Sequence, residues 1–249
     1  MNDMPHADNA EADTNGFTPE PVDKRRVVVL ISGNGSNLQA LIDAQRHDEL
    51  GGEIVAVISN RGDAYGLVRA KEAGIDAVVL PHQEYDDREA YDRALIKVID
   101  RHAPDLIVLA GFMRILTPMF VHRYAGRVLN IHPSLLPAYQ GLHTHQRALD
   151  DGVAEHGASV HFVTEELDGG PVVMQAVVKV GENQSLETLV EKVQAREHLI
   201  YPIAARWFLE GRLRLGAEGA LFDNMPLPPT GLRMSHEDAA EELDEDIDA

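Results

Sequence analysis

Residues 26–37 read RVVVLISGNGSN and join an apolar run to a Gly-rich loop. The run is β-branched and continuous, which is typical of a strand buried on both faces of a parallel sheet. Residues 36–47 then place Leu38, Leu41 and Ile42 on one face of a helix. A buried strand, a glycine turn and a helix in this order predict the start of an α/β fold.

The same alternation continues along the chain. Further apolar runs occupy 54–58, 77–80, 106–110 and 128–131, and helical patterns occupy 64–73 and 86–102. Strands alternating with helices predict a right-handed, doubly wound, mostly parallel sheet of the Rossmann-like kind.

The pattern changes after about residue 155. Residues 158–163 and 172–180 alternate in polarity, which predicts antiparallel strands added to the sheet in the C-terminal part. Residues 185–210 predict a long amphipathic helix with Ser185 as its N-cap. The remainder to about Leu232 is short and rich in Gly and Pro, and we expect it to pack on the surface.

Composition limits the class of protein. The chain has 249 residues, 44% of them hydrophobic, and no Cys. The lack of Cys excludes disulfides, Cys-ligated zinc and a thiol nucleophile. No apolar run approaches the roughly 20 residues that span a bilayer, and residues 1–23 lack the layout of a signal peptide. We therefore expect a cytoplasmic enzyme without a membrane partner.

The net charge of −19 lies mainly at the two ends of the chain. Residues 1–23 and 235–249 hold fourteen acids and no Lys or Arg, which leaves about −5 for the rest. We predict disordered acidic extensions at 1–24 and 233–249 around one domain at 25–232. One interpretation is that the extensions bind a partner or adapt the protein to a salty cytoplasm. The other is that they only increase solubility. The sequence has no cluster of Lys and Arg residues of the kind that binds nucleic acid.

The loop at residues 32–37 is a candidate anion site. Glycines allow a tight turn that exposes backbone N–H groups, the helix N-terminus adds positive potential, and Ser36 adds a hydroxyl. The loop lacks the Lys of a phosphate-binding P-loop and the full dinucleotide fingerprint. A phosphate monoester is therefore favoured over a dinucleotide. The alternative is a plain strand-to-helix turn with Ser36 as N-cap.

Residues 130–137 read NIHPSLLP and carry the candidate chemistry. The two-residue spacing of Asn130 and His132 on an extended backbone points both side chains to one face. An amide that stabilises an oxyanion and an imidazole that moves a proton suit acyl-type transfer. Asp168 is a carboxylate that could serve the imidazole. The alternative is a strand end followed by a Pro-rich turn with an exposed His.

Two further features leave alternatives open. Six of the twelve His residues lie between His122 and His161, so we considered a metal site, but no familiar ligand spacing is present. We expect no metal, with His161 lining the pocket and His143 shaping a loop wall. Residues 111–116 follow a strand end and form either an apolar slot with one cation or the start of a packed helix.

Together, these segments resemble one family. Residues 31–39, 110–116, 130–137 and 166–171 are similar to those of the phosphoribosylglycinamide formyltransferases, which are folate-dependent enzymes of purine synthesis. The resemblance spans about residues 26–229. The NIHPSLLP block marks the wider folate formyltransferase group, and the SGNGSN loop narrows it to members that bind a phosphorylated ribose.

The resemblance implies a role for each matching position. Asn130, His132 and Asp168 match the catalytic residues. Gly35, Ser36 and Asn37 match the loop that binds the phosphate of the ribonucleotide. Gln194 and Glu197 match further positions that contact the ribonucleotide. The folate site matches Arg88, Met113, Arg114, Ile115, Leu116, Asn130, Thr164, Glu165, Glu166, Leu167 and Asp168. The N-terminal half of the domain would then bind the phosphoribosyl group and the C-terminal half the folate.

The implied reaction moves the formyl group of 10-formyltetrahydrofolate to the amine of glycinamide ribonucleotide, without a metal, in a monomer or homodimer. One turn departs from the family: where a Leu-Pro-Lys-Tyr-Pro-Gly turn is expected, residues 136–141 contain Ala138 and Gln140 in place of Lys and the second Pro.

Three other functions are alternatives to this one. A methionyl-tRNA formyltransferase would need a further RNA-binding domain, and a formyltetrahydrofolate hydrolase would need an N-terminal regulatory domain. A non-catalytic binder of folate or phosphorylated ligands would not need Asn130, His132 and Asp168 together.

Overall fold

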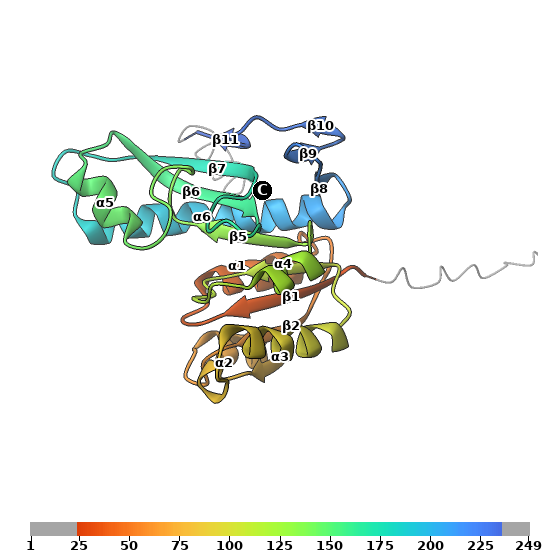
Figure 1. The fold of residues 1–249 in the computed structure, drawn as a ribbon. Helices are drawn as coiled ribbons and strands as arrows, with labels where there is room; N and C mark the ends of the chain where they lie inside the picture. The colour runs from red at the N-terminus through yellow and green to blue at the C-terminus, as the bar shows by residue number, and fades with distance from the viewer. Residues whose placement is uncertain (1–23, 236–249) are drawn as a thin grey trace, which may run out of the picture.

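The computed structural model describes residues 24–235, and the central feature of this part is a twisted, mixed β-sheet covered by helices on both faces (Figure 1). The strands are β1 (Arg26–Ile31), β2 (Glu53–Ser59), β3 (Asp76–Val79), β4 (Leu106–Leu109), β5 (Val128–His132), β6 (Glu155–Phe162), β7 (Val172–Lys179), β8 (Leu213–Leu215), β9 (Ala220–Phe222), β10 (Met225–Pro226) and β11 (Leu232–Met234). The helices are α1 (Ser36–Arg46), α2 (Gly66–Glu72), α3 (Arg88–Arg101), α4 (Pro118–Arg123), α5 (Thr144–Asp150) and α6 (Leu186–Leu209), with a 3₁₀ turn at His82–Glu84.

The strand order across the main sheet is β11-β7-β6-β5-β4-β1-β2-β3. Strands β3, β2, β1, β4 and β5 pair in parallel, whereas β6 is antiparallel to both β5 and β7. The predicted α/β class, with a parallel sheet and antiparallel additions toward the C-terminus, is confirmed. The order of the strands reverses between β1 and β4. Open α/β sheets bind ligands at such a point, in the loops that follow the carboxyl ends of the two strands.

Strand β1 contributes to two apolar cores, one on each face of the sheet. Val27, Val29 and Ile31 pack with α1, α2 and α6, whereas Val28 and Leu30 pack with α3 and α4. All five side chains are fully buried. This explains why the run has no polar alternation, since a strand covered on both faces has no solvent side.

Helix α6 packs across the sheet opposite α3 and α4 (Figure 1). Its N-cap is Ser185, as predicted, and the Ser185 side chain accepts a hydrogen bond from the backbone of Thr188. The buried Tyr201 hydroxyl reaches the backbone oxygens of Leu109 and Leu129, at 2.9 and 3.0 Å. The helix is therefore joined to the last residue of β4 and to the second residue of β5, the strand that carries Asn130 and His132.

Several details differ from the sequence-based expectations. Helix α1 is capped by Gly35 in the left-handed conformation, so Ser36 is its first helical residue and not its N-cap. Residues 111–116 form a loop and not a helix start. Helices α4 and α5 and the small β8–β10 sheet were not predicted.

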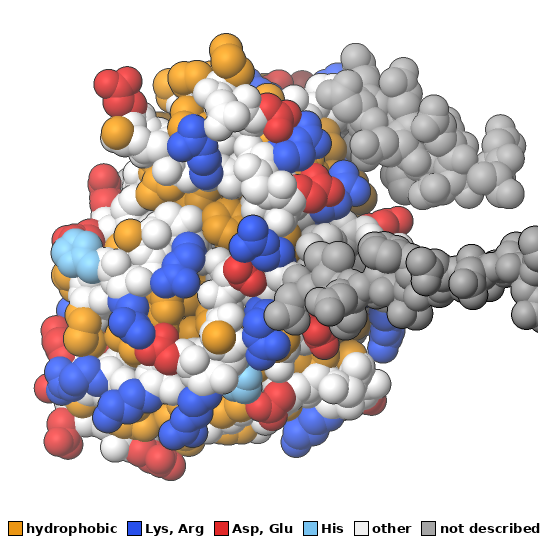
Figure 2. Space-filling model, turned by 90° about the vertical axis from the view of Figure 1, so that its right-hand side faces the viewer, with side chains coloured by type: hydrophobic (Ala, Val, Ile, Leu, Met, Phe, Trp, Pro, Cys, Tyr) orange, Lys and Arg blue, Asp and Glu red, His pale blue; other side chains and the backbone are white. Residues whose placement is uncertain are grey.

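The two terminal expectations fall mostly outside the described residues. Strand β11 pairs with β7 through Met234, so ordered structure continues two residues past the expected boundary at 232. The rest of both acidic extensions lies outside residues 24–235. Within that part, acidic and basic side chains are mixed over the face shown in Figure 2, and no helix has the length and apolarity needed to cross a membrane.

Candidate active site

The loops that follow β1, β4 and β5 meet the β6–β7 loop around two connected cavities. The larger cavity has a volume of about 650 Å³ and includes Asn37, His132 and Glu197 in its lining. The smaller one lies between residues 111–116 and the segment 163–168. Both cavities are lined by Asn130 and Asp168. The structure therefore places Asn130 and Asp168 where the two cavities adjoin, with His132 on the wall of the larger one.

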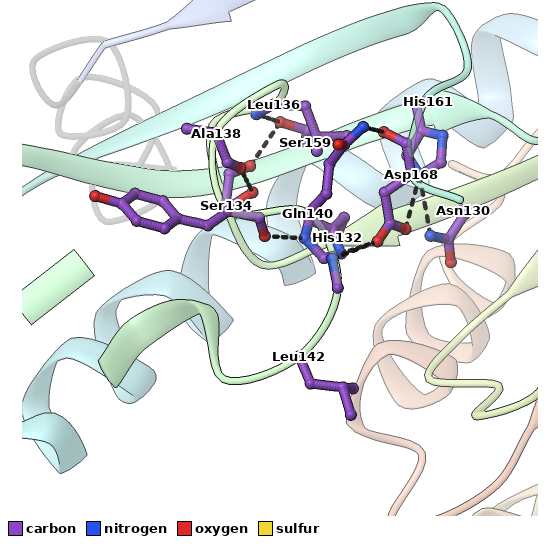
Figure 3. Close-up of polar contacts among 12 residues, drawn as sticks. Asn130, His132, Ser134, Leu136, Ala138, Gln140, Leu142, Ser159, His161 and Asp168 are labelled. Atoms are coloured by element: carbon purple, nitrogen blue, oxygen red, sulfur yellow. Dashed lines mark hydrogen bonds and ion pairs between the residues drawn. The ribbon is translucent and has the colours of Figure 1, made fainter. Parts of the chain in front are cut away.

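His132 and Asp168 face each other (Figure 3). The His132 Nδ1 atom lies 3.5 Å from Asp168 Oδ2, and the two side chains are only 7% and 9% exposed. The other ring nitrogen, Nε2, lies 2.9 Å from the backbone oxygen of Tyr139. Both nitrogens therefore face oxygen acceptors, which suits an imidazolium with two N–H donors.

Asn130 is oriented by a second buried imidazole. Its amide nitrogen lies 3.0 Å from His161 Nε2, and His161 Nδ1 lies 2.9 Å from the backbone oxygen of Phe162. Burial lowers the pKa of His161 to about 4, so the neutral ring donates at Nδ1 and accepts at Nε2. The Asn130 NH₂ group must therefore point at His161, which fixes the plane of the amide.

The contact between His161 and Asp168 is not an ion pair at neutral pH, because His161 is uncharged there. His161 Nε2 lies 3.9 Å from Asp168 Oδ1. Asp168 instead receives a hydrogen bond at Oδ2 from the Gly141 backbone N–H, at 2.9 Å. Sequence patterns carry no signal for backbone partners such as Gly141 N–H and Tyr139 C=O, since any residue type supplies them.

The 111–116 loop lines both cavities and is held by buried polar side chains that the sequence analysis missed. Ser32 Oγ accepts a hydrogen bond from the backbone of Met113, at 2.8 Å. Asp92, on α3, accepts two from Thr117, both at 2.7 Å. Met113 and Ile115 remain 65% and 55% exposed at the cavity mouth, which is suited to binding the apolar part of a ligand.

The predicted folate-site segments are brought together with one exception. Arg114, Ile115 and Leu116 face Thr164, Glu165, Glu166, Leu167 and Asp168 across the smaller cavity. Arg88 is exposed at the first turn of α3 and lines neither cavity. The position of Arg88 therefore does not support its predicted contact with folate.

The predicted ribonucleotide residues also converge, although Gln194 and Glu197 lie some 160 residues from the loop. Gln194 donates to Ser36 Oγ at 2.8 Å, and Asn37 donates to Glu197 at 2.9 Å. Gly35 has φ of +75° and approaches Gly66 closely. The N-terminus of α1, where the sequence predicts an anion site, thus has side chains from α6 bonded to its first two residues.

Glu197 differs from the solvated helix charge that its sequence context suggests. It is only 8% exposed, and burial raises the pKa of its carboxyl to about 7, against the opposing effect of the Asn37 hydrogen bond. It therefore titrates near neutral pH on the wall of the larger cavity.

The remaining His residues do not change this description. His145 and His156 contact each other at 3.2 Å, and burial lowers the pKa of both rings. Within residues 24–235, no group of three or more His, Asp or Glu side chains is arranged to hold a metal ion.

Comparisons with known proteins agree with this geometry. The family model described as formyl transferase matches residues 25–205. The chain belongs to the formyl transferase family. The resemblance to this family seen in the sequence is thereby confirmed.

Individual relatives in this family are similar over most of the chain. The phosphoribosylglycinamide formyltransferase of Escherichia coli (strain K12) is 58% identical over 205 residues, covering 82% of this chain and 97% of that protein. That of Haemophilus influenzae is 48% identical, covering 83% and 98%. The solved structure of the phosphoribosylglycinamide formyltransferase from Coxiella burnetii is 50% identical, covers 85% and 99%, and superposes with a TM-score of 0.82.

The buried carboxyl of Glu197 predicts a pH dependence of stability. Its ordinary value is 4.5, so between about pH 4.5 and 7 the unfolded chain loses this proton before the folded protein does. The contribution of the Glu197 carboxyl to the free energy of unfolding is therefore fully present below pH 4.5 and is lost as pH rises through 7. Relative to Glu197→Gln, we expect the wild type to lose about 1–3 kcal/mol across this window, measured by urea unfolding at several pH values.

Glu191→Gln is the matched control, because Glu191 is exposed on the same helix. Its stability should follow the wild type at every pH. Parallel curves for the wild type and Glu197→Gln would show that the buried carboxyl does not titrate in this range.

Proposed function

We propose that this formyl transferase moves a formyl group from 10-formyltetrahydrofolate to the amine of glycinamide ribonucleotide. The observation that carries the proposal is the placement of Asn130, His132 and Asp168 between two binding spaces. One space reaches the anion site at residues 35–37, and the other is the slot between residues 111–116 and 163–168. A phosphorylated substrate and a flat heterocycle can thus approach the same three side chains.

The anion site supports a phosphorylated ribose as one ligand. Backbone N–H groups at the start of α1 and the Ser36 hydroxyl suit a phosphate. Glu197 and Asn37, which line the cavity beyond this loop, offer polar groups suited to sugar hydroxyls. The relatives named as phosphoribosylglycinamide formyltransferases support the choice of ribonucleotide.

The smaller cavity supports a folate as the other ligand. Its walls combine apolar side chains, such as Leu116 and Val163, with the polar groups of residues 164–168. This combination suits a flat heterocycle whose edge carries hydrogen-bonding groups. We propose that formyl folate is the co-substrate, and we expect the enzyme to act as a monomer or homodimer.

The transfer needs a group that stabilises an oxyanion, a group that carries a proton and a charge that supports this second group, and these side chains can supply all three. The substrate amine attacks the formyl carbon, and the carbonyl oxygen becomes a tetrahedral oxyanion. The Asn130 N–H that is not bonded to His161, together with protonated His132, stabilises this oxygen. The Asp168 carboxylate faces His132 Nδ1 and stabilises the positive charge that the ring carries while it holds the transferred proton.

Collapse of the intermediate then breaks the bond between the formyl carbon and folate N10. One proton leaves the attacking amine and one is gained by N10, so the proton count balances. His132 can pass this proton directly or through a water molecule. The formyl group ends on the ribonucleotide amine, with tetrahydrofolate as the second product and no covalent enzyme intermediate.

The decisive experiment mixes purified protein with a 10-formyl folate and glycinamide ribonucleotide, and follows deformylation by absorbance. A parallel reaction omits the ribonucleotide. Turnover that requires the ribonucleotide supports the proposal. Equal turnover without it would indicate a hydrolase, and no turnover by folded protein would indicate a binding role or another formyl acceptor.

The anion site leads to a separate prediction about binding. A Cβ atom at Gly35 would lie 2.8 Å from the Cα of Gly66, and the residue has a left-handed backbone. Gly35→Ala should therefore move the loop and raise KM for the ribonucleotide at least tenfold, equivalent to about 1.4 kcal/mol. KM for the folate should change little, and steady-state kinetics with each substrate varied in turn would measure both.

Gly74→Ala controls for backbone strain alone. Gly74 has φ of +74°, but a Cβ atom there would meet nothing within 4 Å, and the residue lies at the end of α2. This control should leave both KM values unchanged. An equal rise in the folate and ribonucleotide KM values for Gly35→Ala would contradict the assignment of the loop.

A further inference from the structure

The turn at residues 139–141 contacts both His132 and Asp168 through three consecutive residues (Figure 3). The Tyr139 backbone oxygen accepts from His132, and the Gly141 N–H donates to the Asp168 carboxylate. Between them, the Gln140 side-chain amide donates to the Asp168 backbone oxygen at 3.2 Å. The Gln140 contact depends on side-chain identity, and the similar family turn has a Pro at this position, which cannot make it.

A second side chain, Arg147 on α5, braces the same turn. Its Nη1 atom donates to the backbone oxygen of Gln140 at 2.7 Å and lies 3.4 Å from that of Leu142. Its guanidinium also lies over the Tyr139 ring, 5.2 Å from the centroid. Since a guanidinium has five donors in a fixed plane, one side chain can hold several points of a turn.

The loop that receives the Gln140 contact needs such support. Asp168 has φ of +51°, a left-handed conformation that is unfavourable for a residue with a Cβ atom. Within the loop, the Gly169 N–H bonds to the Glu166 backbone oxygen. Among the described residues, Gln140 is the only hydrogen-bond donor that reaches the Asp168 backbone oxygen. Strained conformations persist only where surrounding contacts hold them.

We propose that Gln140 and Arg147 are positioning residues that hold the 164–170 loop so that the Asp168 carboxylate faces His132. Arg147 fixes the turn, and Gln140 connects the turn to the loop backbone. The expected effect on turnover rests on the proposed function. The expected effect on the loop is independent of it. Both residues are exposed, so neither contributes a core contact that would explain the same effects through global stability.

The test substitutions remove the contacts and preserve size. Gln140→Met lacks the amide donor, and Arg147→Lys keeps the charge but loses the planar set of donors. Gln146→Met is the matched control, because Gln146 is also exposed but bonds only to Asp150 within α5. Thermal unfolding should give similar midpoints for all variants.

The first measurement is hydrogen–deuterium exchange of the ligand-free protein over residues 164–170. We expect faster exchange in Gln140→Met and Arg147→Lys than in the wild type or Gln146→Met. Unchanged exchange in both variants would overturn the inference. Faster exchange in a protein that shows no transfer activity would support the role of Gln140 and Arg147 in holding the loop and contradict only the proposed function.

The second measurement is the division of the effect between kcat and KM. We expect kcat to fall about 3- to 10-fold in Gln140→Met, the range for one lost neutral hydrogen bond, with KM for the ribonucleotide unchanged. The double variant should lose less than the product of the single losses, because both residues act through one turn. An unchanged kcat, or a loss carried by KM for the ribonucleotide, would overturn the inference.

Discussion

Replacement of His132 by alanine is expected to lower kcat by about 10²–10⁴-fold, the usual range for a general acid–base residue. The side chain lines the larger cavity beside Asp168, with both ring nitrogens facing oxygen atoms. Its loss removes the proton carrier and one stabilising group of the proposed oxyanion. The phosphate loop at residues 35–37 is separate in the chain, so the ribonucleotide should still bind, as measured by calorimetry.

His47→Ala is the control for this substitution. His47 is exposed at the end of α1 and lies outside both cavities, so its removal should leave kcat unchanged. If His132→Ala bound ribonucleotide and retained wild-type turnover, His132 would have no part in proton transfer. Unchanged affinity without any assayable turnover in the wild type would instead favour a pure binding protein.

Asp168→Asn is expected to lower kcat by at least about 10²-fold with little change in either KM, because it removes a preorganised charge and keeps the shape of the side chain. The Asn oxygen can still accept the hydrogen bond from Gly141, so the loop should hold its position. The same oxygen would then still face His132 Nδ1, and the Asn NH₂ group would take the place of Oδ1 beside His161. A neutral amide oxygen stabilises a positive charge on His132 far less than a carboxylate does, so the electrostatic support for the proposed chemistry would be lost.

The control for this change is Asp63→Asn, at an exposed carboxylate that pairs only with Arg61. Single-turnover kinetics with both substrates saturating would separate the chemical step from binding. A rise in KM without a fall in kcat would show that Asp168 binds folate and takes no part in the transfer. Wild-type kinetics in both variants would remove Asp168 from the mechanism.

The strands were predictable because burial on both faces leaves a simple signal. The run at β1 has no polar residue among Val27–Ile31, and all of these side chains are buried. Helix α4 has only six residues and α5 only seven, which is too short for a helical period to be recognised. The β8–β10 strands have two or three residues each, so their alternation carries almost no information.

The site was predictable only in part from spacing. Asn130 and His132 lie on one strand, so two-residue spacing places them on one face. The approach of Asp168 to His132 depends on the antiparallel pairing of β5, β6 and β7, which local sequence does not specify. The roles of Gln194 and Glu197 were inferred from family resemblance alone, because only the packing of α6 against α1 brings them to the phosphate loop.

That packing of α6 has a consequence for recombining this enzyme with its relatives. Ser36 and Asn37 come from the first helix of the described chain, yet their side-chain partners Gln194 and Glu197 come from the last. Tyr201 of the same helix also bonds to the last residue of β4 and to Leu129 in β5. A chimera divided near residue 155 would therefore split the proposed ribonucleotide site between two parents, and its α6 segment would have to match the first parent at these contacts.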